Sequence, residues 1–367
     1  MIKLIETGIV YRNPQPHLRA VHTWHPSIVV LGATELLASF DLGQGAESLD
    51  YRTWVARSVD GGRTWSKPYR MFEDPVQPTT HSARMAIMPD GSIVAIGIRQ
   101  YRDDPEEGVV NPATFGYIRS DVILLRSSDG GRTFRGPEVV RPPLVGPAFE
   151  LCHRIVPLKD GRWLYPTQTW KGWNGEAPDG MKSVAFVSTD QGRSWPTYID
   201  IMDDTKNGVI HFEQGLAQID DGRLVDAAWA FQESSGKSLP NRLAISQDGQ
   251  RFGPIMPAGL NGETIKIIPF GGNTVFGLYR RTDRRGLWAF LADVGRDSWT
   301  IREQAPMWQG GDANLVGGSA DSNATYLSAI KFGFPMMSLL PDGSIFAVFW
   351  CMEDNIQNIR WLRIQAS

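Results

Sequence analysis

The stretch SVDGGRTW occupies residues 58–65 and returns as SSDGGRTF at residues 127–134 and as STDQGRSW at residues 188–195. A shorter copy, SQDGQRF, covers residues 246–252, and a looser one begins at Asp293. In each copy the Asp carboxylate can accept hydrogen bonds from backbone N–H groups, Gly allows a positive φ, and the aromatic residue can pack beneath the turn. The motif therefore predicts a repeated structural turn rather than a carboxylate site or a calcium loop.

A second repeat alternates with the first and consists of two apolar runs joined by an Asp-Gly step. It occurs at residues 90–91, 160–161, 221–222 and 342–343, with degenerate copies around residues 33 and 272. Asp-Gly between apolar runs is a strong hairpin signal. Six units of about 61 residues each predict an all-β, six-bladed propeller that forms one domain over residues 1–367. We expect the strand-like segment 2–11 to complete the last blade and close the ring.

Composition narrows the function classes. The chain of 367 residues carries a formal net charge of -3, which argues against a nucleic-acid or anionic-membrane partner, because phosphate binding needs a basic surplus. Two cysteines exclude a disulfide framework. No apolar run approaches the roughly 20 residues of a membrane span, and no secretory signal is visible, so we expect a cytoplasmic protein. The oligomeric state is not predicted.

The alternation of these turns and hairpins resembles the sialidase (neuraminidase) superfamily, whose Asp-box repeats build six-bladed propellers. The resemblance covers nearly the whole chain and implies a carbohydrate-active protein. Sialidases bind the substrate carboxylate with three arginines and use a Tyr nucleophile paired with a Glu, together with an Asp as acid and base. The superfamily also includes other exo-glycosidases, some lyases and non-catalytic propellers, so the fold alone does not fix the reaction.

Carried over residue by residue, the family pattern is only partly present. Glu213 stands eight residues before Asp221, where the family has its Glu. Trp24 stands in place of the first arginine, and the segment 227–231 contains no second one. The third arginine has candidates within the segment 280–285. Phe334, eight residues before Asp342, replaces the nucleophilic Tyr and has no oxygen to attack with, so a standard sialidase mechanism is not expected.

Four histidines precede the hairpins of four successive units: His25, His81, His153 and His211. They lie 8, 9, 7 and 10 residues before the hairpin position, and small differences in turn length would bring them into one register around the channel mouth. Histidine can act as acid or base near neutral pH. The alternative for each is a core histidine that satisfies backbone groups. His211 and Glu213 are two residues apart and should share one strand face.

Other candidates surround this predicted centre. Asp50, like Asp41 and Glu47, lies in the region that supplies the family's acid/base Asp, or else in a solvated loop. Arg281 and Arg285 could bind a substrate carboxylate as a bidentate pair or form a charged surface turn. Aromatic residues could stack on sugar rings or line the substrate site; these are Trp24, Trp170, Trp229 and Phe334.

Three functions remain open. The first is an exo-acting glycoside hydrolase on an acidic or deoxy sugar, with Glu213, Asp50 and the four histidines in catalytic roles and no cofactor. The second is an oligosaccharide or polysaccharide lyase that uses His, with a divalent metal if the histidines converge. The third is a glycan-binding propeller without catalysis. All three take an oligosaccharide or glycoside as partner.

Overall fold

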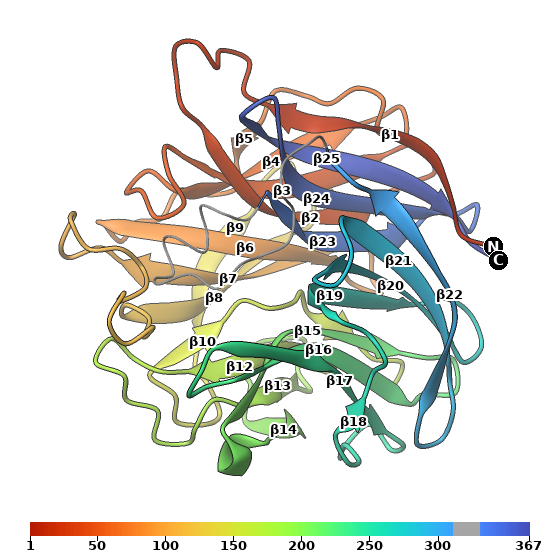
Figure 1. Ribbon diagram of the computed structural model, residues 1–367. Coiled ribbons are helices and arrows are strands. Elements are labelled where there is room, and N and C mark those ends of the chain that lie inside the picture. The colour runs from red at the N-terminus through yellow and green to blue at the C-terminus, as the bar shows by residue number, and fades with distance from the viewer. Residues whose placement is uncertain (311–330) are drawn as a thin grey trace.

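Six antiparallel sheets surround a common centre in the computed structural model, which describes residues 1–310 and 331–367 (Figure 1). Each sheet is one blade, and its strands follow one another outward from the centre. The predicted six-bladed, all-β propeller is therefore confirmed. No helix of the described ranges is long and apolar enough to cross a membrane.

The first three blades take up the chain in order. Blade 1 contains β2 (His22–Val30), β3 (Leu36–Gly43), β4 (Arg52–Ser58) and β5 (Tyr69–Arg70). Blade 2 contains β6 (Thr79–Ile87), β7 (Ile93–Tyr101), β8 (Ser120–Ser127) and β9 (Arg135–Val140). Blade 3 contains β10 (Ala148–Glu150), β11 (Val156–Pro157), β12 (Trp163–Trp170), β13 (Ser183–Ser188) and β14 (Thr197–Met202).

A short 3₁₀ helix, η1 (Thr205–Asn207), leads into the second half. Blade 4 contains β15 (Val209–Gln218), β16 (Leu224–Gln232), β17 (Lys237–Ser246) and β18 (Met256–Pro257). Blade 5 contains β19 (Gly262–Pro269), β20 (Thr274–Arg281), β21 (Leu287–Val294) and β22 (Trp299–Trp308). Blade 6 contains β23 (Phe332–Leu339), β24 (Ile345–Glu353), β25 (Ile356–Gln365) and, outermost, β1 (Lys3–Arg12).

The ring is closed by the two ends of the chain. Strand β1 pairs antiparallel with β25, from Lys3 opposite Gln365 to Arg12 opposite Asn358. The Met1 amino group lies 2.6 Å from the Ser367 carbonyl oxygen, and the two termini are side by side in Figure 1. The predicted closure by the N-terminal strand is confirmed. A closed ring leaves blade 6 without an unpaired outer edge on β25.

The Asp turns have the predicted chemistry. Asp60 accepts hydrogen bonds from the Thr64 N–H at 2.9 Å and the Thr64 hydroxyl at 2.6 Å, and these bonds hold the pKa of Asp60 at about 2. Gly61 and Gly62 have φ of 74° and 95°. The Trp65 indole N–H donates to the Gly62 carbonyl at 2.8 Å. Hydrogen bonds within the turn occupy both oxygen atoms of the Asp60 carboxylate, so the role of Asp60 is structural.

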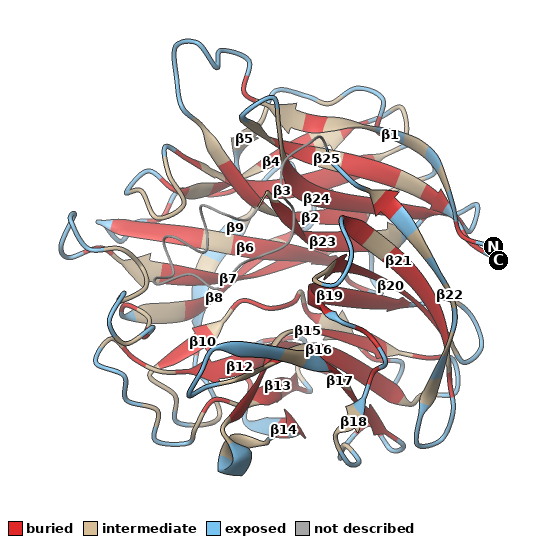
Figure 2. Cartoon of the chain, viewed as in Figure 1, coloured by how far each residue is buried: buried red, intermediate tan, exposed pale blue. Residues whose placement is uncertain are grey.

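The hydrophobic core is divided into layers between neighbouring blades. Six of the apolar clusters in the described ranges each join one blade to the next. The inner strands are almost entirely buried, as Figure 2 shows, whereas the outer strands and loops are exposed. Because the apolar side chains pack between blades, the centre of the ring is left to polar side chains.

Candidate functional site

Four inner strands carry the same backbone irregularity near the centre. Strands β2, β15, β19 and β23 each contain a register shift in the pairing with the next strand. At these shifts the chain takes a left-handed conformation at His25 (φ 50°), Glu213 (φ 50°), Thr264 (φ 53°) and Phe334 (φ 50°). Non-glycine residues rarely adopt this conformation, and such strain is concentrated at functional sites. The repeated bulge therefore marks equivalent positions in four blades.

Phe334 lies among charged groups rather than in an apolar layer alone. Its ring centroid is 4.8 Å from the Arg84 guanidinium carbon and 5.0 Å from the Lys266 ammonium nitrogen. The imidazole of His25 packs edge-on against it, with the ring centroids 5.0 Å apart. A phenyl ring stabilises nearby cations through its electron-rich face. Phe334 therefore contacts two buried cations and one histidine.

Glu213 lies close to Lys266. The Lys266 ammonium donates hydrogen bonds to the carbonyl oxygens of Glu213 at 2.8 Å, Gln214 at 3.2 Å and Ile265 at 3.2 Å. Within residues 1–310 and 331–367, the buried Glu213 Oε2 atom has no hydrogen-bond partner. Burial raises the pKa of Glu213 to about 7, which Lys266 opposes and Glu150 reinforces. The carboxyl group is therefore poised between its acid and base forms at neutral pH.

Two further carboxyl groups share the field of Lys266. Asp226, on β16, is completely buried, and neither of its carboxyl oxygens has a hydrogen-bond partner. Burial raises the pKa of Asp226 well above its ordinary value, and it also raises that of Glu150. Desolvation favours the neutral form of a carboxyl group. This side of the centre consequently holds carboxylic acids around one cation.

The surroundings of His25 are organised by Asp41, which is completely buried on β3. Its Oδ2 atom lies 3.2 Å from His25 Nδ1, and its Oδ1 atom accepts the Thr53 hydroxyl at 2.7 Å. The Ser82 hydroxyl also donates to Asp41, and the Arg84 guanidinium is 3.6 Å away. The Tyr51 hydroxyl lies 3.2 Å from His25 Nδ1. Asp41 therefore fixes the orientation of the imidazole.

Three cationic side chains stand two residues nearer to the hairpin turns than the left-handed positions do. Arg84, Arg154 and Lys266 each stand six residues before the turn position of their inner hairpin. Arg154 of blade 3 donates to the Ile28 carbonyl at 3.2 Å in blade 1 and to the Met337 carbonyl at 3.0 Å in blade 6. Because blades 3 and 6 face each other across the ring, the Arg154 side chain bridges the axis.

Several solved structures resemble this chain in fold at low sequence identity. No family model and no curated protein sequence matches the chain. Among solved structures, a Dyadobacter fermentans protein of unknown function matches with 17% identity and a TM-score of 0.77, over 100% of this chain and 99% of that one. The intramolecular trans-sialidase of Ruminococcus gnavus matches with 13% identity and a TM-score of 0.63, over 94% of each chain. The NanB sialidase of Streptococcus pneumoniae matches with 12% identity and a TM-score of 0.65, over 98% of this chain and 70% of that one. The chain is a sialidase-like propeller. At these identities the likeness shows the fold alone.

In this sialidase-like propeller the four predicted histidines have separate surroundings. His25 lies in the centre with Asp41, whereas His81 stacks on Phe72 at 4.2 Å between ring centroids. His153 Nδ1 lies 2.8 Å from the Arg154 carbonyl oxygen, and both ring nitrogens of His81 and His211 are buried without hydrogen-bond partners. Burial lowers the pKa of His81 and His153 to about 3 and that of His211 to about 4.

Turn length does not bring these histidines into register. All six inner hairpins close with the same bond, from the N–H of one residue to the carbonyl four residues later; the donors are Leu31, Met88, Leu158, Ile219, Phe270 and Leu340. The offsets of 9, 7 and 10 residues for His81, His153 and His211 therefore remain different from that of His25. Within residues 1–310 and 331–367, no group of three or more His, Cys, Asp or Glu side chains is arranged to hold a metal ion.

The other predicted charged residues of the sialidase-like propeller lie outside the centre. Asp50 is exposed and accepts the Ser48 hydroxyl at 2.6 Å and the Gln44 N–H at 3.0 Å within its own loop. Arg281 is paired with Asp283 at 2.6 Å, and Arg285 is exposed on the same turn. Arg280, one residue earlier, is the member of this run that points inward, toward Glu263 and the Phe332 carbonyl at 2.8 Å.

The predicted aromatic residues form two groups. Trp24 is buried against His25 and Trp350, with ring centroids 5.2 Å apart in both pairs. Trp170 stacks on Tyr117 at 5.6 Å and donates its indole N–H to the Phe115 carbonyl at 2.7 Å. Trp229 is half-buried and contacts the rings of its neighbours Phe212 and Phe231 at 5.6 and 5.3 Å. The second group contains Phe212, the residue before Glu213 on β15.

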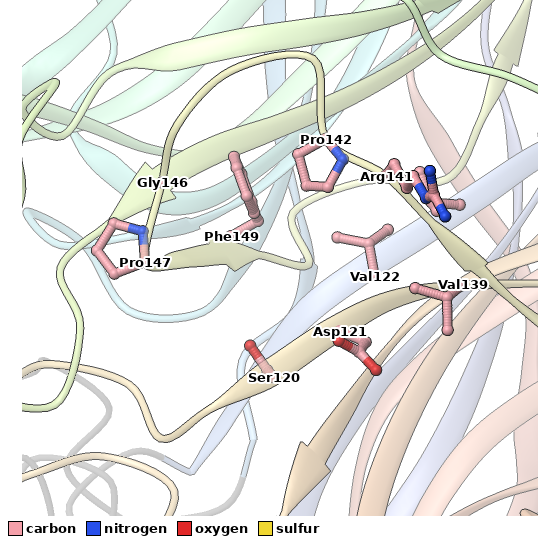
Figure 3. A pocket seen from close by; sticks show the side chains of 10 residues that line it. Ser120, Asp121, Val122, Val139, Arg141, Pro142, Gly146, Pro147 and Phe149 are labelled. Carbon is pink, nitrogen blue, oxygen red and sulfur yellow. The ribbon is translucent and has the colours of Figure 1, made fainter.

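Two adjoining hollows, of about 260 and 550 Å³, lie away from this centre, along the edge strand β9. Figure 3 shows the first, where Asp121, Val122 and Arg141 face Phe149 across the gap between blades 2 and 3. Asp121 is already engaged by the Tyr101 hydroxyl at 2.6 Å and by Arg99 at 3.5 Å. This groove is lined mainly by Val, Pro and Phe and holds no set of groups suited to acid–base chemistry.

Sequence reasoning missed several central residues for a simple reason. It searched for histidines and for family positions, and it did not follow each inner strand two residues further along the same face. That step from the positions of Ser82 and Thr264 leads to Arg84 and Lys266. Glu150, Asp226 and Tyr51 come from other strands or loops, so no count within one hairpin could have found them.

Proposed function

We propose that this chain is a glycoside hydrolase that acts at the mouth of the central channel on the end of a glycan carrying an acidic or deoxy sugar. The proposal rests on the surroundings of Glu213. It occupies a strained left-handed position on an inner strand, its Oε2 atom is buried without a partner, and burial raises its pKa to about 7. A carboxylic acid in this state can protonate a departing glycosidic oxygen.

Three further features support a sugar as the ligand. The half-buried aromatic cluster of Phe212, Trp229 and Phe231 includes the residue that precedes Glu213 on β15 and offers ring faces on which a sugar can stack. Arg84 supplies a buried positive charge beside Phe334, and its Nε–H has no partner, which suits an anionic substituent. The sialidases among the matching structures support the same class of ligand by analogy of fold.

The test is incubation of the full chain with a panel of acidic, deoxy and neutral oligosaccharides, followed by mass spectrometry of the products. Hydrolysis gives products whose summed mass exceeds that of the substrate by one water. We expect Glu213→Gln to lower kcat by about 100-fold or more, the contribution of a general acid. Glu106→Gln, on an exposed loop, is the matched control and should retain activity. Binding of a glycan without any cleavage would overturn the proposal in favour of a binding propeller.

A second candidate is elimination, and the His25–Asp41 pair favours it. A lyase removes a proton from carbon beside a carboxylate with a base such as His, and Asp41 holds His25 ready for such a role. Elimination gives products whose masses sum to that of the substrate, with one unsaturated sugar. The same mass measurement therefore separates the two reactions.

A further inference from the structure

We propose that His25 is the base that activates water in this hydrolysis and that Asp41 is the residue that positions it; this inference rests on the proposed function. The two residues act as one unit at the same level of the ring as Glu213, because His25 and Glu213 both occupy left-handed positions eight residues before their hairpin turns. In this arrangement Glu213 is the acid and His25 the base, while Phe334, whose ring contacts His25, supplies no reactive group.

The first argument is the hydrogen bonding of the imidazole. Asp41 Oδ2 lies 3.2 Å from His25 Nδ1 and 3.6 Å from the Arg84 guanidinium. An imidazole that donates from Nδ1 carries its lone pair on Nε2. The Thr53 and Ser82 hydroxyls donate to the same carboxylate and hold it in place. The tautomer required of a base acting through Nε2 is therefore built into the site.

The second argument is accessibility. The His25 side chain keeps 29% of its surface exposed while its Nδ1 faces the fully buried Asp41, so Nε2 is the nitrogen that remains for a ligand. His81, His153 and His211 are each at most 4% exposed as residues. None of those three has a carboxylate hydrogen-bonded to its ring in the structure. Among the predicted histidines, only His25 combines a carboxylate partner with an open face.

The third argument is the protonation state at neutral pH. The charged and titratable groups that face His25 are His22 on its own strand, Asp41 on β3, Tyr51 before β4 and Arg84 on β6. Burial lowers the pKa of His25, Arg84 lowers it further, and Asp41 opposes both. Phe334, on β23, adds an apolar edge. The imidazole is therefore neutral, as a base must be, under the conditions in which Glu213 is still partly protonated.

The chemical step then balances. His25 Nε2 takes a proton from water as the water oxygen bonds to the anomeric carbon, and the glycosidic C–O bond breaks as its oxygen takes a proton from Glu213. The net reaction adds one water, and transfer through solvent returns the proton from His25 to Glu213. Because Phe334 supplies no nucleophilic oxygen, we expect a single displacement and inversion at the anomeric carbon.

The positioning role of Asp41 can be tested without a substrate. Full-length protein with ¹⁵N-labelled histidine reports in long-range ¹H–¹⁵N spectra which ring nitrogen is protonated, and the His25 signals are those lost in His25→Asn. Asn tolerates the left-handed backbone at this position. We expect a protonated Nδ1 in the wild type at pH 7.5 and loss of that preference in Asp41→Asn. A wild-type His25 protonated on Nε2 would overturn the proposal, and this result does not require the Asp41→Asn variant to fold.

The catalytic role needs the substrate identified by the glycan panel. Asp41→Asn and His25→Asn should each lower kcat by about 100-fold or more with a smaller change in KM, and both should abolish the acidic limb of the pH profile. Asp297→Asn, an exposed surface change, is the control. An unchanged acidic limb in His25→Asn, or a product with retained configuration, would overturn the role of His25. If the panel shows no cleavage, the proposed function fails and the catalytic role with it, while the tautomer measurement still decides the positioning by Asp41.

Discussion

Glu213 combines two features that lower the free energy of unfolding. Its backbone is left-handed, which costs of order 1–3 kcal/mol in a non-glycine residue. Its side chain places a carboxyl group where burial raises its pKa to about 7. Both features oppose folding, so a residue that relieves either of them should make the protein more stable.

Glu213→Gln is therefore expected to stabilise the protein in a pH-dependent way. The folded-state pKa of about 7 exceeds the ordinary value of 4.5, so the stability contributed by this group is complete below pH 4.5 and is lost as the pH rises through 7. The glutamine cannot ionise and escapes that loss. The variant should gain up to about 3 kcal/mol over the wild type at pH 8 and little at pH 5.

Chemical unfolding at pH 5 and pH 8 measures this difference. Glu106→Gln, an exposed carboxylate on a loop, serves as the matched control and should show no such pH dependence. Equal stability of Glu213→Gln and the wild type at pH 8 would show that the carboxyl group is not desolvated as described.

Three residues of the site could be found from the sequence by counting. Counting eight residues back from the hairpin turn leads to His25, Glu213 and Phe334, and the structure gives these three the same left-handed backbone. The count works because all six hairpins have turns of equal length. It cannot find Asp41, because that residue reaches the centre from the second strand of its blade.

At the scale of the element, the inner strands obey two different rules. Strand β6 pairs with β7 without a register shift, whereas β2, β15, β19 and β23 each contain one. A β-bulge redirects one side chain without changing the rest of the strand. Period-two alternation predicts the strands well, and it fails at the bulges, which carry no distinct sequence signature such as glycine.

The closing strand β1 gives a test at this scale. Gly8 lies so close to β25 that a Cβ atom there would come within 2.7 Å of the Trp361 indole. Gly8→Val should therefore push β1 away from β25 and lower the free energy of unfolding by about 1–3 kcal/mol, the usual cost of overpacking. Ile5→Val, at an exposed position of the same strand, should change it little.

Thermal unfolding of the two β1 variants provides the comparison. A Gly8→Val protein as stable as Ile5→Val would mean that β1 contributes little to ring closure. Increased self-association of Gly8→Val would agree with an exposed β25 edge, because unpaired edge strands promote aggregation.

At the scale of the whole molecule, buried histidines and buried carboxyl groups act in opposite directions. Burial lowers the pKa of His81, His153 and His211, so their share of stability is lost as the pH falls below 6.5. Burial raises the pKa of Glu213 and Asp226, whose share is lost as the pH rises. Between pH 4.5 and 6.5 the two sets oppose each other, so we expect the stability of the wild type to depend less on pH than the three histidines alone would make it.

Removing one buried histidine should change how the free energy of unfolding depends on pH. His211→Phe deletes a buried imidazole without hydrogen-bond partners, so its stability relative to the wild type should increase as the pH falls from 7 to 5. One such group contributes about 1.4 kcal/mol per pH unit in that range. Urea unfolding at several pH values measures the slope, with His17→Phe at an exposed position as control. A parallel pH dependence of His211→Phe and the wild type would contradict a neutral His211.

The fold could be predicted from sequence much more completely than the site. Each blade packs mainly on the next one in the chain, so a repeated pattern of turns and hairpins is enough to specify the ring. The centre instead gathers residues from positions as distant as His25 and Phe334. Their approach depends on bulges and on strands from several blades, which no pattern within one repeat records.

The bridge formed by Arg154 has a consequence for traffic through the molecule. Its guanidinium spans from blade 3 to carbonyl groups of blades 1 and 6, beneath the layer that holds His25 and Glu213. The Arg154 side chain therefore stands in the path of a sugar chain along the central axis. Under the proposed function, substrate and product would therefore enter and leave the centre at the same mouth.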